Sequence, residues 1–217
     1  MRVLIANNSG QEARRLAATF PGRVGHLMGP DGWRRPDPAF PYAIDNGAFG
    51  AWKAGRAFDA NAFLGLLARV KREPVQPEWI AVPDVVMDRA GTLSMWQHWA
   101  PVVADVGAPL AFVVQDGMKA VDLPAEAHVV FVGGSTPWKW LTLPMWCELG
   151  RRVHVGRVNT VRRLRHCARL GVESCDGKGY FKGNRRQLDA AWYFLADMQR
   201  MGDPVDGPMQ SRLAPGW

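Results

Sequence analysis

The chain has 217 residues, of which 47% are hydrophobic and 22% are charged, so it is long and apolar enough to fold as one domain around a sizeable core. This composition excludes a disordered chain, and no run approaches the roughly 18 apolar residues that a membrane-spanning helix needs. The formal net charge of +7 favours a polyanionic partner, of which nucleic acid is the commonest.

Short apolar runs alternate with longer amphipathic runs along the chain. The short runs are rich in Val, Ile and Phe and are apolar throughout, which is typical of strands covered on both faces. We place these strands at residues 3–6, 24–28, 42–44, 79–82, 110–114, 129–132, 153–155 and 172–175. Helices are predicted between them at residues 11–20, 59–72, 88–104, 137–149, 160–170 and 185–201.

Turn and cap residues support several of these boundaries. Asp59 is a suitable N-cap, and Thr136 is expected to cap a helix that has Pro137 in its first turn. Gly171 is suited to end the helix before it. The helices expected after Met28 and Gln115 must be short or replaced by loops, because the chain is near the lower size limit for eight strand–helix units.

Eight strands that alternate with helices predict a compact (β/α)8 TIM-type barrel, in the α/β class. An open, doubly wound sheet is the main alternative. We assign residues 1–202 to a single catalytic barrel domain and residues 203–217 to a Pro/Gly-rich tail. The apolar start of the chain is too short for a signal peptide, so a cytoplasmic protein is expected.

Polar residues or glycines follow nearly every predicted strand. Since the carboxyl ends of parallel strands meet on one rim, these residues are candidates for a shared site. The rim positions that we single out are Asp45, Asp84, Gln115, Gly133, Gly134 and Asp176. Asp and Asn at such positions are also common as helix caps and in turns, but three aspartates on one rim favour a site.

The residue types indicate which chemistry that rim performs. The sequence has no phosphate-binding loop, nucleophile elbow or HExxH pair, and its histidines and cysteines lack ligand spacing, so we expect neither a metal nor a cofactor. His154, inside a strand, is expected to be a packed or hydrogen-bonded structural residue. Carboxylates without a cofactor suit displacement at an acetal-like carbon, in which one acts as nucleophile and another moves a proton.

The motifs at these strand ends, taken in chain order, resemble those of the tRNA-guanine transglycosylase superfamily. The segment 45–49, Asp-Asn-Gly-Ala-Phe, is similar to that family's Asp-Ser-Gly-Gly-Phe, and segments 114–117 and 132–135 resemble its Val-Gln-Gly-Gly and Gly-Gly segments. The stretch 154–176 resembles the long segment that ends in the family's nucleophilic aspartate. The family's zinc subdomain is absent here, which makes the chain more similar to the short phage and bacterial relatives that insert 7-deazaguanines into DNA.

This resemblance implies a pentosyltransferase that exchanges guanine in nucleic acid, with DNA favoured over tRNA, for a free 7-deazaguanine base such as preQ0. Asp176 would be the nucleophile and Asp45 the general acid or base. The base would be bound by Asp84, Gln115, Gly133 and Gly134 and stacked by Phe49 or Trp138. Phosphates of the nucleic acid would be held by Lys178, Lys182, Arg185 and Arg186.

The resemblance also implies a possible homodimer, and a host-cytoplasm location if the source is a virus. The residues leave four alternatives open. They are a base-excising nucleic-acid glycosidase, a tRNA-guanine transglycosylase, a nucleic-acid-binding barrel with a decayed site, and a barrel enzyme that acts on small sugars.

Overall fold

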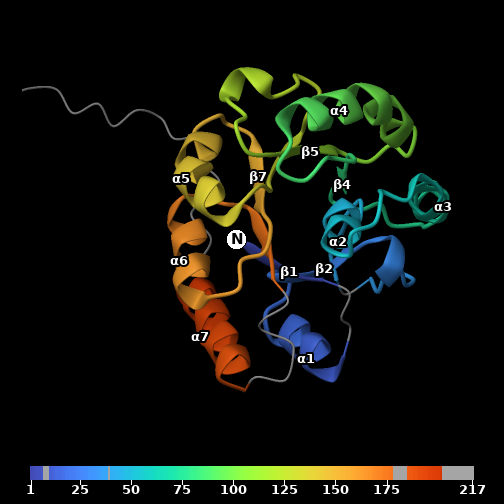
Figure 1. The fold of residues 1–217 in the computed structure, drawn as a ribbon. Coiled ribbons are helices and arrows are strands. Elements are labelled where there is room, and N and C mark those ends of the chain that lie inside the picture. The colour runs from blue at the N-terminus through green and yellow to red at the C-terminus, as the bar shows by residue number, and fades with distance from the viewer. Residues whose placement is uncertain (7–9, 39, 178–184, 202–217) are drawn as a thin grey trace, which may run out of the picture.

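A computed structural model describes residues 1–6, 10–38, 40–177 and 185–201. Its eight strands form one closed parallel barrel in which each strand pairs with its neighbours in chain order (Figure 1). The barrel closes between the first and last strands, where Val3 is in register with Cys175 and Leu4 with Asp176. The predicted (β/α)8 barrel is therefore confirmed, and the open doubly wound sheet is wrong.

The strands are short, as the apolar runs predicted, and they lie within a few residues of the expected positions. They are β1 (Arg2–Ala6), β2 (Val24–Met28), β3 (Tyr42–Ile44), β4 (Ile80–Ala81), β5 (Leu110–Val114), β6 (Val129–Val132), β7 (Arg152–Val155) and β8 (Ser174–Asp176). Most of their residues are buried on both faces, which explains why the runs are apolar throughout instead of alternating.

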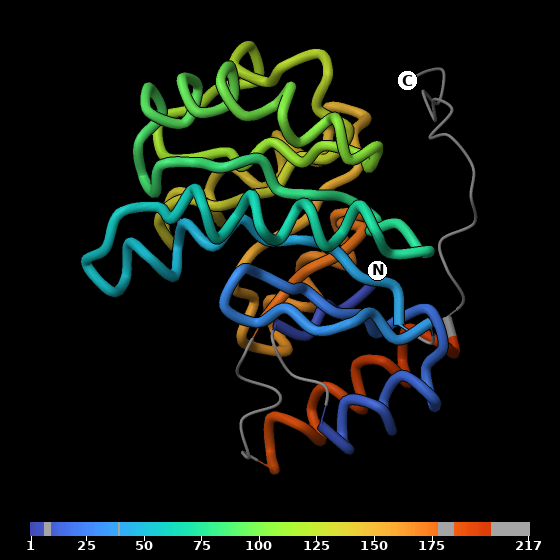
Figure 2. Tube along the Cα trace, turned by 90° about the vertical axis from the view of Figure 1, so that its right-hand side faces the viewer, coloured from blue at the N-terminus to red at the C-terminus, as the bar shows by residue number. Residues whose placement is uncertain are grey.

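Helices surround the barrel on its outer side (Figure 1). They are α1 (Gln11–Thr19), α2 (Ala48–Lys53), α3 (Ala60–Val70), α4 (Arg89–Ala104), α5 (Thr136–Cys147), α6 (Val161–Arg169) and α7 (Arg185–Met201). Among the described residues of the connections after β2 and β5, the helical elements are the short 3-10 helices η1 (Pro30–Gly32) and η2 (Ala120–Asp122), as the chain length predicted. The last helix lies beside the first (Figure 2), and Trp192 of α7 packs edge-on against Phe20 at 5.0 Å.

Two apolar layers hold the barrel together. The barrel interior is filled by Leu4, Leu27, Ala43, Trp79, Ala81, Ala111, Val113, Val129 and Phe131. A larger cluster packs the outer faces of the strands against the helices. Because these side chains fill the interior at this level, a ligand site is expected at the mouth of the barrel.

Local details differ from the sequence-based expectation at two places. The six-residue helix α2 was not predicted, because it is too short to show a hydrophobic period. At α5 the N-cap position is Ser135 instead of Thr136, with Pro137 in the first turn as expected. Asp59 caps α3 by accepting a hydrogen bond from the N–H of Ala62 at 2.9 Å, and Gly171 adopts the expected left-handed conformation with φ of 72°.

The predicted tail, residues 203–217, lies outside the described residues. In the part of the chain that the structure describes, no helix combines the length and apolar character needed to span a membrane.

Candidate functional site

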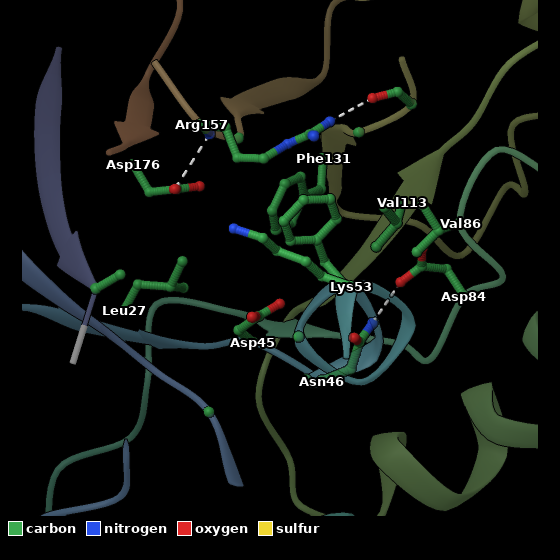
Figure 3. Close-up of a pocket in the computed structure, with 18 of the residues that line it drawn as sticks. Leu27, Asp45, Asn46, Lys53, Asp84, Val86, Val113, Phe131, Arg157 and Asp176 are labelled. Atoms are coloured by element: carbon green, nitrogen blue, oxygen red, sulfur yellow. Dashed lines mark hydrogen bonds between the residues drawn. The ribbon is translucent and has the colours of Figure 1, made fainter. Parts of the chain in front are cut away.

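A cavity of about 510 Å³ opens at the carboxyl ends of the strands. It is lined by residues at or shortly after the carboxyl ends of all eight strands, and all six predicted rim residues are among them, with the three aspartates labelled in Figure 3. The predicted residues in its wall are Asp45, Phe49, Asp84, Gln115, Gly133, Gly134 and Asp176. Thus the aspartates that follow β3 and β4 and that end β8, far apart in the sequence, share one cavity.

Asp84 is buried in the cavity wall and held by two side-chain amides. Asn46 donates from Nδ2 to Oδ1 of Asp84 at 2.8 Å, and Gln115 donates from Nε2 to Oδ2 at 2.6 Å. Burial raises the pKa of Asp84 to about 6, although both hydrogen bonds oppose the rise. This carboxyl group can therefore gain or lose a proton close to neutral pH.

The two amides are themselves fixed by the backbone. Gln115 Oε1 accepts hydrogen bonds from the N–H of Met87 at 2.8 Å and from the N–H of Gly134 at 3.0 Å. Asn46 Oδ1 accepts from the N–H of Ala48 at 2.8 Å. Both NH2 groups must consequently face Asp84. Gln115 and the Gly134 N–H, both in the cavity wall, thus form part of the frame that orients this carboxyl group.

The glycine pair after β6 has a packing role. A Cβ atom on Gly133 would come within 2.9 Å of Nε2 of Gln115, and one on Gly134, with φ of +65°, within 2.6 Å of Asp116 Oδ2. Asp116 secures the same loop by accepting from the N–H of Ser135 at 2.6 Å. The glycines thus allow the loop to approach Gln115 and Asp116 closely.

Asp176 is held from both carboxylate oxygens. Its Oδ2 lies 3.1 Å from Nε2 of His154, and its Oδ1 accepts from the N–H of Arg157 at 3.1 Å. The other ring nitrogen of His154 lies 2.8 Å from Oγ of Ser174. His154 is fully buried and packs between Trp79 and Phe131, with ring centroids at 4.7 and 4.5 Å. The sequence predicted a hydrogen-bonded structural histidine, and the structure shows that its hydrogen bonds orient Asp176.

Two cationic side chains enter the same cavity. The guanidinium group of Arg157 lies over the ring of Phe49, 4.3 Å from its centroid, and donates to the carbonyl of Gly134. Lys53 extends from α2 across the cavity, and its amine lies between Asp45 and Asp176 in the view of Figure 3. Phe49 is consequently stacked by a side chain of the protein itself.

Several predicted residues lie elsewhere. Trp138 is behind the Gly134 loop, outside the described cavity wall, and its ring packs towards Trp146 with a centroid separation of 6.3 Å. Arg185 is at the start of α7, where its Nε lies 3.1 Å from Asp189. Arg186 follows it on α7, outside the described wall. Lys178 and Lys182 lie outside the described residues.

Sequence reasoning did not select Lys53, Asn46, Arg157 or His154, which contact or face the carboxylates of the site. Lys53 could not be found because α2 itself was not predicted. Asn46 and Arg157 are each the second residue after a strand, so the rule that selected the aspartates could have selected them as well. His154 had one usable signal: it lies in β7, and β7 is the neighbour of β8, which carries Asp176.

The site offers proton transfer, hydroxyl binding and anion binding within one cavity. Asp84 supplies a carboxyl group poised near neutrality, Asp45 and Asp176 supply hydrogen-bond acceptors, and Lys53 and Arg157 supply positive charge. Among the described residues, no three His, Cys, Asp or Glu side chains are grouped so as to hold a metal ion.

Comparisons with known proteins identify the fold. No family model and no curated protein matches the chain. KGPDC from Streptococcus mutans matches with a TM-score of 0.55, 15% identity and coverage of 91% of this chain and 97% of the other. The same protein in complex with ribose 5-phosphate matches with a TM-score of 0.53, 12% identity and coverage of 91% and 97%. Phosphoribosyl anthranilate isomerase from Thermus thermophilus matches with a TM-score of 0.51, 17% identity and coverage of 91% and 99%. A putative fructose-1,6-biphosphate aldolase from Coccidioides immitis matches with a TM-score of 0.54, 10% identity and coverage of 92% and 87%.

These matches correct the resemblance drawn from the sequence. The similar barrels are KGPDC, a phosphoribosyl anthranilate isomerase and a putative fructose-1,6-biphosphate aldolase, and none is a transglycosylase by name, so the tRNA-guanine transglycosylase assignment is wrong. The expectations that depended on this assignment are also wrong. They are guanine exchange in DNA or tRNA, preQ0 as a substrate, base excision, a decayed nucleic-acid-binding barrel and a phage source. Nucleic acid and a free deazaguanine base are likewise withdrawn as partners. The internal use of Gln115 and Gly134 gives a physical reason, because these groups are already paired within the protein.

Proposed function

We propose that the chain is an enzyme that acts on a small sugar phosphate by acid–base catalysis, removing and returning a proton next to a carbonyl group. The observation that carries this proposal is the convergence of Asp45, Asp84 and Asp176 with Lys53 and Arg157 on one cavity. The cavity volume of about 510 Å³ lies within the range of about 300–1,000 Å³ typical of small-molecule sites.

Each group has a part in the proposed reaction. Asp84 exchanges the proton, because a general base works best when its pKa is close to the working pH. Lys53 and Arg157 hold the phosphate or the oxyanion that develops as the proton leaves. Asp45 and Asp176 accept hydrogen bonds from sugar hydroxyls.

Charge narrows the substrate class. Asp31, Asp45 and Asp176 add negative charge to a wall with two cations, so a large polyanion would be repelled from most of it. A substrate with one phosphate and several hydroxyls can place each kind of group against a complementary side chain. The complex of KGPDC, a protein with the same fold, with ribose 5-phosphate supports this class of ligand.

The test is proton exchange in D2O, followed by ¹H NMR with D-ribulose 5-phosphate and, in parallel, unphosphorylated D-ribulose. We expect the signals of the protons beside the carbonyl group to disappear faster with protein than without it, and only for the phosphorylated sugar. Asp84→Asn should abolish the acceleration, whereas Asp105→Asn, the same change on an exposed residue paired with Lys71, should retain it.

Absence of both exchange and binding at about 10 mM of each pentose would refute the proposal, since that limit corresponds to less than about 3 kcal/mol of affinity. Equal exchange with the two sugars would keep an acid–base role for Asp84 but reject the phosphate as a recognised group.

A further inference from the structure

Lys139 is a lysine of helix α5 whose side chain is buried instead of solvated. Its residue is only 2% exposed, although α5 lies on the outer side of the barrel. Burying an ammonium group is unfavourable unless a specific partner compensates it. Within the described chain, Nζ of Lys139 donates a hydrogen bond to the carbonyl oxygen of Gly156.

The carbonyl that Lys139 holds belongs to the same peptide unit as the N–H that holds Asp176. That unit joins Gly156 to Arg157, and the N–H of Arg157 donates to Oδ1 of Asp176 at 3.1 Å. In a trans peptide the C=O and N–H bonds point in opposite directions, and no cis peptide occurs in the described chain. The unit is therefore fastened on its outer side by Lys139 and on its inner side by Asp176.

The conformation at this point would not persist without such contacts. Arg157 has φ of +59°, a left-handed conformation that is unfavourable for a residue with a long side chain. A Cβ atom at Gly156 would come within 2.7 Å of Phe131, so the peptide lies close against the barrel interior. Rotation of this peptide unit would take the N–H away from Asp176 and turn the carbonyl oxygen towards the carboxylate.

We propose that Lys139 is a positioning residue of the cavity: by holding the Gly156 carbonyl from outside the barrel, it keeps the Arg157 N–H on Asp176 and so fixes this carboxylate. The role of the carboxylate in catalysis rests on the proposed function. The clamp itself is a property of the free protein and can be measured without any substrate.

The surroundings of Lys139 make the clamp sensitive to pH. The charged and titratable groups that face it are Arg157 from the β7–α6 loop, Asp176 from β8, and Arg163 and Cys167 from α6. Burial, followed by Arg157, lowers the pKa of Lys139 to about 7, and Asp176 partly opposes this. Because an uncharged amine is the weaker donor, the hold on Gly156 should loosen as the pH rises through neutrality.

The test compares Lys139→Met, which matches the lysine side chain as far as Cε but lacks the Nζ donor, with Lys71→Met, the same change at an exposed lysine paired with Asp105. We expect hydrogen exchange at the Arg157 amide to accelerate at least about tenfold in Lys139→Met, while amides of β5 and β6 stay protected. The ¹⁵N signals of the His154 ring should also move, since His154 contacts Asp176. Unchanged Arg157 exchange and His154 signals in folded Lys139→Met would overturn the proposal.

If Lys139→Met does not fold, a pH titration of the wild-type protein tests the same proposal. The ¹⁵Nζ signal of Lys139 gives its own titration midpoint, and the Arg157 amide and His154 ring signals should shift with that same midpoint. Independent titration of the three would overturn the clamp. Where a substrate has been found, Lys139→Met should lower kcat/KM by about 10- to 100-fold. A failed substrate screen leaves the NMR result untouched, so the two proposals fail separately.

Discussion

Replacing Asp84 by asparagine measures how strongly the cavity wall disfavours a negative charge at this position. The pKa of Asp84 rises from 3.8 to about 6, mainly through burial. One pKa unit corresponds to about 1.4 kcal/mol, so this shift amounts to about 3 kcal/mol. Because the folded state binds the proton more tightly than the unfolded state, the ionised group costs stability: the cost is absent at acid pH and grows as the pH rises from about 4 through 6.

The assay is urea denaturation of wild type and Asp84→Asn at several pH values from 4 to 7. The difference between their free energies of unfolding removes the contribution of groups common to both proteins. We expect wild type to lose about 2 kcal/mol relative to the variant over this range, because part of the shift is already felt at pH 4. Asparagine also places an NH2 group against the donor of Asn46 or Gln115, but that penalty does not depend on pH and leaves the slope unchanged.

Asp105→Asn is the matched control, because it makes the same substitution on a side chain that is 76% exposed. Its difference from wild type should change by less than about 1 kcal/mol over the same range, as expected for an exposed ion pair. A wild-type stability that increased with pH relative to Asp84→Asn would refute the reasoning, since that sign belongs to a carboxylate stabilised by its surroundings. A flat difference would show that burial and the two amide hydrogen bonds cancel.

Three further predictions concern other parts of the structure. His26 is buried, and neither of its ring nitrogens is hydrogen-bonded to the described chain. Burial, followed by the charge of Arg34, lowers the pKa of His26 to about 4. The stability that the neutral ring contributes is therefore intact above pH 6.5 and is lost as the pH falls towards 4. His26→Leu should remove about 3 kcal/mol of that acid-side loss in urea titrations, and an equally steep loss in the variant would contradict this. Arg157→Gln should weaken the binding of D-ribulose 5-phosphate at least about tenfold in calorimetry without changing the affinity for D-ribulose. The same substitution at the exposed Arg151 should change neither affinity. Equal weakening for both sugars would show that Arg157 does not bind the phosphate. His154→Phe keeps an aromatic ring between Trp79 and Phe131 but removes the contact with Asp176. We expect kcat/KM to fall about 10- to 100-fold, and an unchanged kcat/KM would exclude this orienting role.

The barrel and the location of its site could be read from the sequence because both depend on strand order. Apolar runs without alternation indicate buried parallel strands, and the residue after each run falls on the same rim. Asp45, Asp84 and Asp176 were selected by this rule alone, and all three line the cavity. The two connections predicted to be short also contain only the 3-10 helices η1 and η2.

The remaining features depend on side-chain direction, which the sequence does not specify. A lysine inside an amphipathic helix normally reaches solvent, so Lys139 carried no signal that it turns inward to Gly156. Gln115 at a strand end is equally compatible with contacting a ligand and with bracing Asp84. The side-chain orientation of Gln115 is set by the N–H groups of Met87 and Gly134, which donate to its Oε1 and so turn its NH2 group towards Asp84.

The erroneous transglycosylase resemblance has a physical explanation of the same kind. In any (β/α)8 barrel, strand ends tend to carry polar residues and glycines, and their order along the chain follows the order of the strands. An ordered set of such motifs is therefore strong evidence for the barrel fold but weak evidence for which reaction the barrel catalyses. The residues that distinguish one barrel chemistry from another are those that the fold does not demand at their positions. Here these are Lys53 and Arg157, the cations in the cavity, and the Asn46 and Gln115 amides, both of which donate to Asp84.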